Sequence, residues 1–142
     1  MRFRVGAVLM LSALVGFGSS TPLVAHHSVS GQFDMSKTAT LKGVISRIDW
    51  INPHIFVHLD VPEDNGATTT YMLETFPPSQ MRAAGLTKEL LSGKLGEVVT
   101  ITILPARDGS QHIGYIERIT YQDGHFNQLS SNEAEQNRRR AQ

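Results

Sequence analysis

The sequence contains no cysteine among its 142 residues. A disulfide framework, a lipid-modified N-terminal cysteine, a thiolate metal site and a cysteine nucleophile are therefore excluded. Any fold must be stabilised by its hydrophobic core alone.

The chain also lacks an excess of charge of either sign, since 13 Lys and Arg balance 13 Asp and Glu. Five of the basic residues and two of the acidic ones lie outside residues 26–126, so this central part is mildly acidic. Nucleic acids select basic protein surfaces. We therefore expect no nucleic-acid partner.

The sequence offers no enzyme motif: it has no Gly-rich phosphate loop, no Gly-x-Ser-x-Gly elbow and no His-Glu-x-x-His helix. The carboxylates have no spacing that demands an acid and base pair. An enzyme is the least favoured of the function classes considered, and no catalytic residue is assigned.

The apolar run at residues 5–17 is shorter than the roughly 20 residues that a transmembrane helix needs. Arg2 and Arg4 precede the run, and Leu23-Val24-Ala25 ends with a small residue suited to cleavage. This order is typical of a secretory signal peptide. We predict a signal peptide at residues 1–25 and an exported protein, periplasmic or extracellular, with no stable membrane span after processing; the alternative is an uncleaved anchor.

Strand patterns dominate residues 38–126, which we expect to form one domain. Residues 54–61 alternate as in a half-buried strand. One face carries Ile55, Val57, Leu59 and Val61, and the other carries His54, Phe56, His58 and Asp60. Three such segments precede a short helix, expected between Ser79 and Gly85, and two follow it. A second helical turn, capped by Thr87, is expected at residues 87–91. This order predicts an all-β fold with a little helix: an OB-like five-stranded barrel with the helix between strands 3 and 4. A β-sandwich, or a sheet with one covering helix, is the alternative.

The strand patterns also predict a core. Gly43 marks a bulge or bend in the first strand. Residues 26–37 form an N-terminal segment of the mature protein, and the polar residues 127–142 form a disordered tail, since they bury too little apolar surface to offset the entropy of ordering. The expected core residues are Val44, Ile48, Ile55, Val57, Leu59, Leu73, Val99, Ile101, Ile103 and Ile119.

Several short motifs are spread over residues 25–126: Ala25-His26-His27-Ser28, Phe33-Asp34, Leu41-Lys42-Gly43-Val44, Trp50-Ile51-Asn52-Pro53-His54, Arg82-x-x-Gly85-Leu86-Thr87, Asp108-Gly109-Ser110 and Asp123-Gly124. Together they resemble a family of short exported bacterial proteins known as a domain of unknown function. The resemblance implies export and a small β-barrel, and it implies no established activity and no catalytic residues. Leu86 stands where the family often has tryptophan.

The histidine pair His26-His27 gives the sharpest functional hypothesis. Cleavage after Ala25 would give His26 both a free α-amine and an imidazole, two nitrogen ligands from one residue. Such nitrogen ligands suit divalent metals, with Cu(II) favoured. A third nitrogen would come from His54, which precedes the alternating strand. The alternative for His54 is a structural hydrogen bond to a turn, and His58, His112 and His125 are expected at the surface.

A metal-free binding module is the second functional hypothesis, because OB barrels bind ligands across strands 2 and 3. Phe56 lies on the polar face of the alternating segment and would contact such a ligand. Trp50 would either join Phe56 in an aromatic platform or anchor the core.

Overall fold

Most of the alternating segment at residues 54–61 forms a strand, and three of its four inward side chains are fully buried. In the computed structural model, which describes residues 28–129, this strand is β2 (Phe56–Pro62). Ile55, Val57 and Leu59 have no exposed surface. The period of two therefore identified both the strand and its core face.

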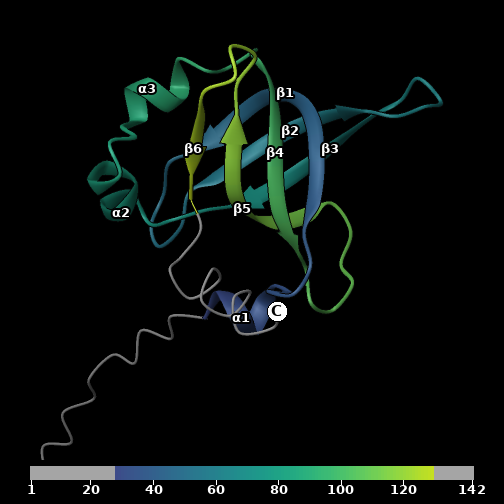
Figure 1. The fold of residues 1–142 in the computed structure, drawn as a ribbon, viewed down its shortest axis with the longest axis horizontal. Coiled ribbons are helices and arrows are strands. Elements are labelled where there is room, and N and C mark those ends of the chain that lie inside the picture. The colour runs from purple at the N-terminus through teal and green to yellow at the C-terminus, as the bar shows by residue number, and fades with distance from the viewer. Residues whose placement is uncertain (1–27, 130–142) are drawn as a thin grey trace, which may run out of the picture.

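Five strands close a barrel, and β6 extends its sheet at the edge of β5 (Figure 1). The sheet order is β3-β2-β1-β4-β5-β6, and a parallel pairing of β3 with β5 joins the ends. All other pairings are antiparallel. This topology confirms the expected OB-like barrel. Its remaining strands are β1 (Ala39–Asp49), β3 (Thr68–Glu74), β4 (Val98–Pro105), β5 (Ile113–Thr120) and β6 (Phe126–Gln128).

One part of the core prediction, in β1, is wrong. Val44 is half-buried, and its neighbour Ile45 is fully buried instead. The register with β2 shifts between Ile45 and Arg47, so Ser46 is an extra residue that reverses the inward and outward positions. After this bulge Ile48 packs against the core as expected. The bulge lies three residues beyond Gly43, which had been expected to mark it.

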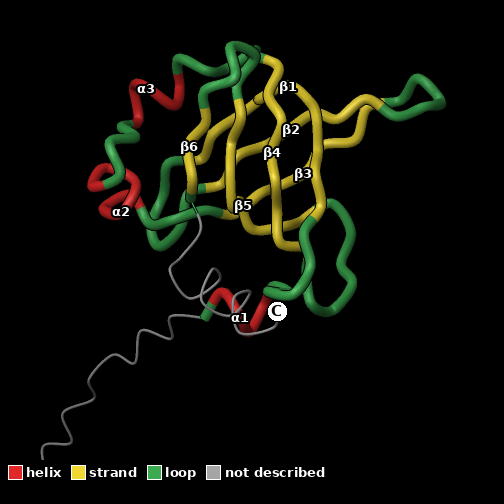
Figure 2. The backbone as a smooth tube through the Cα atoms, in the orientation of Figure 1, coloured by secondary structure: helices red, strands yellow, loops and turns green. Residues whose placement is uncertain are grey.

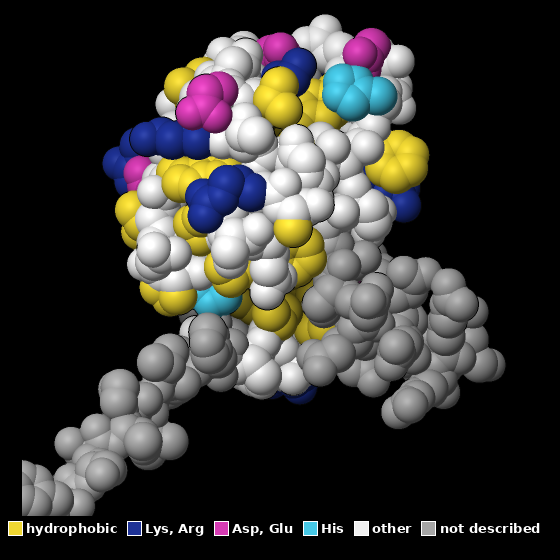
Figure 3. All heavy atoms as spheres, turned by 90° about the vertical axis from the view of Figure 1, so that its left-hand side faces the viewer, with side chains coloured by type: hydrophobic (Ala, Val, Ile, Leu, Met, Phe, Trp, Pro, Cys, Tyr) yellow, Lys and Arg dark blue, Asp and Glu magenta, His cyan; other side chains and the backbone are white. Residues whose placement is uncertain are grey.

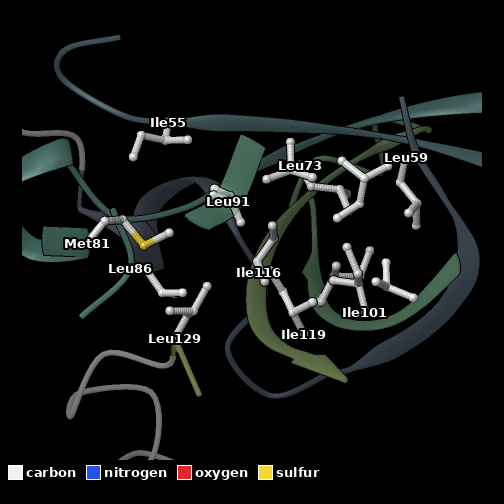
Figure 4. Close-up of a cluster of buried hydrophobic side chains, with 14 of the residues drawn as sticks. Ile55, Leu59, Leu73, Met81, Leu86, Leu91, Ile101, Ile116, Ile119 and Leu129 are labelled. Atoms are coloured by element: carbon white, nitrogen blue, oxygen red, sulfur yellow. The ribbon is translucent and has the colours of Figure 1, made fainter. Parts of the chain in front are cut away.

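Two short helices, α2 (Pro78–Ala83) and α3 (Lys88–Ser92), connect β3 to β4 (Figure 2). The Thr87 hydroxyl caps α3 by accepting from the Leu90 amide at 3.3 Å, which confirms its expected role. The helix preceding it starts at Pro78, with no side-chain cap. Met81 and Leu91 project from the two helices into the barrel core (Figure 4).

The N-terminal segment packs on the barrel through a second, smaller core. Helix α1 (Val29–Gln32) leads into Phe33, which pairs with Ala106 beyond the end of β4. Phe33 and Met35 are buried with Tyr115 and Leu104. At the other end, β6 and buried Leu129 continue past residue 126, where the barrel was expected to end. Among residues 28–129, no helix has the length and apolar composition that crossing a membrane requires.

Candidate functional site

The outer face of β2 and β3 carries a row of side chains set by the strand register. Phe56 lies opposite Asp49 of β1 on one side and Glu74 of β3 on the other. Because alternate residues of a strand share a face, His58 and Met72 form the next row. One aromatic ring is therefore flanked by two carboxylates on the outside of the barrel.

A hollow of about 450 Å³ opens at this face. β2 and β3 contribute Phe56, Met72 and Glu74, and β5 contributes Ile113 and Gly114. The opposite wall comes from the N-terminal segment and the connection between β4 and β5. Its side chains at the hollow are Gln32, Phe33, Ala106, Arg107 and Asp108.

The two parts of that wall are fixed to each other through Arg107. Its Nε donates to the Ser30 carbonyl oxygen at 3.1 Å, and its Nη2 donates to the Phe33 carbonyl oxygen at 3.4 Å. The Arg107 amide also donates to the Gln32 carbonyl oxygen at 2.8 Å. These bonds fix the N-terminal segment to the connection between β4 and β5.

A buried aromatic ring packs against Phe33, one of the residues that line the hollow. Tyr115 is 2% exposed, and its ring centre lies 5.6 Å from that of Phe33. Burial raises the pKa of Tyr115 well above its ordinary value, and the negative charge of Glu74 adds to this. The phenol of Tyr115 therefore stays neutral, and the negative charge of Glu74 contributes to this.

His54 contacts Glu74 at the edge of this face. Its Nδ1 lies 3.2 Å from Oε1 of Glu74 and 3.2 Å from the carbonyl oxygen of Thr75. A carbonyl oxygen can only accept, so Nδ1 carries the proton in the neutral ring. The Nε2 lone pair is then available, which is the tautomer that metal-binding histidines adopt when Nδ1 donates to a carboxylate or carbonyl. This geometry fits both roles considered for His54, the structural bond and the ligand.

His58 is not the solvated residue that its position in the strand predicted, since only 12% of its side chain is exposed. Its Nε2 lies 2.9 Å from Oδ2 of Asp49 and 3.0 Å from Nη2 of Arg47. The hydrogen bond from His58 and that from Arg47 lower the pKa of Asp49. These contacts with two residues of β1 hold the His58 imidazole against the surface of the barrel, so little of it is exposed.

The remaining histidines divide into two groups. His26 and His27 lie outside the described residues, so their part in a metal site stays a prediction. His112 and His125 are exposed as expected, and the His125 ring stacks on Tyr121 at 4.2 Å between centroids. Within residues 28–129, no three His, Asp or Glu side chains are placed to hold a metal ion.

Trp50 and Phe56 do not form an aromatic platform. Trp50 packs against the main core, whereas Phe56 lines the outer hollow. Of the two roles considered for Trp50, the structure supports the core anchor.

Much of the hollow was missed by sequence reasoning. Arg107 and Phe33 are 74 residues apart, and no local pattern relates them. The only signals were indirect: Phe33-Asp34 and Asp108-Gly109-Ser110 are among the motifs of the resemblance. Met72 was missed because an exposed methionine in a strand has many structural explanations.

Elsewhere the surface is mixed. The face seen from the side of α2 and α3 carries Lys and Arg beside Asp and Glu, among separate hydrophobic side chains (Figure 3). Leu90 and Phe126, 58% and 54% exposed, are examples of large hydrophobic residues outside the hollow. Single exposed apolar residues are common on soluble proteins and do not indicate a site.

None of the comparisons with known proteins assigns an activity to this chain. No curated protein matches the chain. Among solved structures, the barrel is similar to Rim1, a mitochondrial single-stranded DNA-binding protein from S. cerevisiae. That likeness has 14% identity and a TM-score of 0.45, and it covers 61% of this chain and 93% of the other. A family model, described as a family of unknown function (DUF6152), matches residues 15–115. Since this match spans well over half of the sequence, the chain belongs to the DUF6152 family.

Proposed function

We propose that this protein is an exported binding module that holds a small ligand in the hollow on the outer face of β2 and β3. The observation that carries the proposal is the hollow itself, with its volume of about 450 Å³. Ligand sites in proteins commonly measure about 300–1,000 Å³ and combine apolar walls with a few polar groups. Phe56, Met72 and Ile113 supply apolar surface, and Glu74 and Arg107 supply the polar groups.

The position of the hollow also supports the proposal. OB barrels bind their ligands across strands 2 and 3 and beside the loops that follow strands 1 and 4. Here the hollow lies on β2 and β3 and beside Ala106, Arg107 and Asp108, which follow β4. The ligand would therefore meet both a rigid sheet and a connecting loop.

Export is part of the proposal and depends on residues 1–25. A basic start, an apolar run and a small-residue end are the features that a signal peptidase substrate presents. Intact mass and N-terminal sequencing of the protein recovered from cells test it. A chain beginning at His26 is expected, and a retained Met1 would contradict export by cleavage.

Binding in the hollow is tested by truncating its most exposed apolar side chain. Met72 is 43% exposed, so Met72→Ala should leave the fold intact while removing ligand contacts. The matched control is Leu90→Ala, on α3 outside the hollow. With 2-phenylethanol as the probe, saturation-transfer NMR should give a signal that Met72→Ala weakens and Leu90→Ala preserves. Equal signals from the two variants would place the probe elsewhere.

A second candidate function is Cu(II) binding through His26, His27 and His54. The observation that favours it is the His54 ring, in which Nδ1 is engaged by Glu74 and Thr75 and Nε2 is left as a ligand atom. His26 and His27 directly precede Ser28 in the sequence, and Ser28 caps helix α1. Helix α1 contributes Gly31 and Gln32 to the hollow.

A further inference from the structure

We propose that the Met72 thioether is a site of reversible oxidation that switches the hollow: peroxide converts it to the sulfoxide, and the sulfoxide weakens the binding of an apolar ligand. The site of oxidation follows from the burial of the methionines. The effect on the ligand rests on the proposed function, since it concerns the same hollow.

Met72 is the exposed one of the three methionines that follow the predicted signal peptide. Its exposed fraction is 43%, against 7% for Met35 and 0% for Met81. The sequence has no cysteine, so these thioethers are the sulfur atoms of the processed chain on which a peroxide would act. Because such oxidation follows solvent access, Met72 should react first.

The two other methionines are protected by the cores in which they pack. Met81 belongs to the main core, and its sulfur accepts a hydrogen bond from the Thr75 hydroxyl at 4.0 Å. Met35 lies in the smaller core with Phe33 and Tyr115. A peroxide molecule reaches either sulfur only when the fold opens locally, which costs free energy. Burial therefore directs oxidation to the hollow.

The backbone of Met72 is held on both sides. It pairs with His58 of β2 and with Ile113 of β5, and its amide donates to the His112 carbonyl oxygen at 2.9 Å. An oxygen atom added to the sulfur stays at the outer face, because moving the residue to the other face would break both ladders. Since the side chain belongs to neither core, the oxidised protein should keep its fold.

The oxidation transfers two electrons from sulfur to a peroxide. A sulfur lone pair attacks one oxygen of hydrogen peroxide and the O–O bond breaks. The proton of the attacked oxygen passes to the departing hydroxide, which leaves as water. The product is a polar, chiral sulfoxide in place of a flexible apolar group. Methionine sulfoxide reductases, supplied with electrons by a thiol, return it to the thioether with release of water, so the change is reversible.

The sulfoxide changes the hollow where its surface is apolar. Phe33, Phe56 and Ile113 line the hollow together with Met72. An apolar ring that lies on the thioether removes apolar surface from water, whereas the same ring on a sulfoxide covers an oxygen that loses its hydrogen bonds to water. Ligand binding and oxidation therefore oppose each other at one sulfur atom.

The site of oxidation is measured by treating the folded, processed chain with dilute hydrogen peroxide and mapping the added oxygen by peptide mass. Cleavage after glutamate separates Met72 from Met81, since Glu74 lies between them. Met72 should be oxidised at least about tenfold faster than Met81, because a core thioether waits for local opening. In concentrated urea the two rates should become equal. Equal rates in the folded protein, or oxidation of Met35 ahead of Met72, would overturn the modification site.

The switch is tested by titrating 2-phenylethanol into the same chain before and after peroxide and taking dissociation constants from amide chemical shifts. Oxidation should weaken binding about tenfold, the effect of covering one unpaired polar oxygen, and reductase treatment should restore it. Met72→Leu is the matched control, because it keeps an apolar side chain of similar size without sulfur. Its affinity should be the same before and after peroxide.

The outcomes separate the switch from the site on which it acts. An unchanged affinity after oxidation of Met72, or an equal loss in Met72→Leu, would overturn the switch while leaving the hollow as a ligand site. Failure of the alcohol to bind the untreated chain would overturn the proposed function and the switch with it. The peptide masses would still decide whether Met72 is the site of oxidation.

Discussion

Glu74 is the residue at which the two proposals meet. Its carboxylate contacts His54 Nδ1 at 3.2 Å and also lines the hollow. In the ligand proposal it is one of the polar groups that line the hollow, and in the copper proposal it holds the His54 ring so that Nε2 is left as a ligand atom. A single substitution at Glu74 should therefore affect both ligand binding in the hollow and copper binding.

Copper binding is predicted to depend on the position of the α-amine. Adding one alanine before His26 in the processed protein keeps every side chain but separates the amine from the first histidine ring. Calorimetric titration with Cu(II) should then show at least about a tenfold loss in affinity, and His54→Ala should weaken binding by a similar factor. Equal affinity with and without the extra alanine would leave ordinary surface histidines as the explanation.

Acid sensitivity is predicted to depend on Asp34. Hydrogen bonds from the Ser36 side chain and amide, and the nearby Lys37 ammonium, lower the pKa of Asp34 from 3.8 to about 2. A carboxyl whose pKa is lower in the folded protein stabilises the fold above its unfolded pKa, and this stabilisation is lost as pH falls from 3.8 toward 2. Asp34→Asn should therefore lower the free energy of unfolding at neutral pH and leave it nearly unchanged near pH 2.

Urea unfolding at several pH values measures this difference. Asp64→Asn, in the exposed turn between β2 and β3, is the control, and its effect should be small at every pH. A variant at Asp34 as stable as the natural chain at neutral pH would show that the Ser36 and Lys37 contacts do not matter for stability.

Among the elements, β1 is the strand whose backbone is most tightly constrained. A Cβ atom added at Gly43 would lie 2.3 Å from the Asp60 carbonyl oxygen of β2, which is backbone and cannot rotate away. Gly43→Ala should destabilise the fold by about 3 kcal/mol or more, because the strands must separate to relieve the overlap. Thermal and urea unfolding measure the cost.

Gly93→Ala is the matched control for this prediction. Gly93 follows α3 with φ −64°, and an added Cβ would meet nothing closer than 3.4 Å. The change should be neutral or stabilise the fold by up to about 1 kcal/mol. If both alanine variants unfolded alike, close packing of β1 on β2 would not be the reason for glycine at residue 43.

The elements also show what the sequence could and could not predict. β2 was predicted with its buried face because apolar residues alternate along it, and the Thr87 cap because its hydroxyl precedes a short helix. The bulge at Ser46 was not predicted, because Val44 and Ile45 are both β-branched and either of them could occupy the core position in β1. The helix α1 and the strand β6 are each at most four residues long, too short to produce a periodic pattern.

For the whole molecule, closure of the barrel is what assembles the site. The hollow takes residues from the N-terminal segment, β2, β3, the β4–β5 connection and β5, which meet only when β3 pairs with β5. Sequence patterns predicted the barrel because each strand is a local feature. They predicted only the Phe56 side of the site, because contacts such as Gln32 to Arg107 join distant parts of the chain.

The most direct test locates the bound probe on the folded protein. Gly31 and Gly114 line the hollow, whereas Gly85 and Gly124 do not, and glycine amides are readily followed in a ¹H–¹⁵N spectrum. Titration of the processed, ¹⁵N-labelled chain with 2-phenylethanol should shift the Gly31 and Gly114 signals along one saturable curve and leave those of Gly85 and Gly124 in place. Shifts confined to Gly85 or Gly124, or no saturable shift at Gly31 and Gly114, would contradict a ligand site on the outer face of β2 and β3.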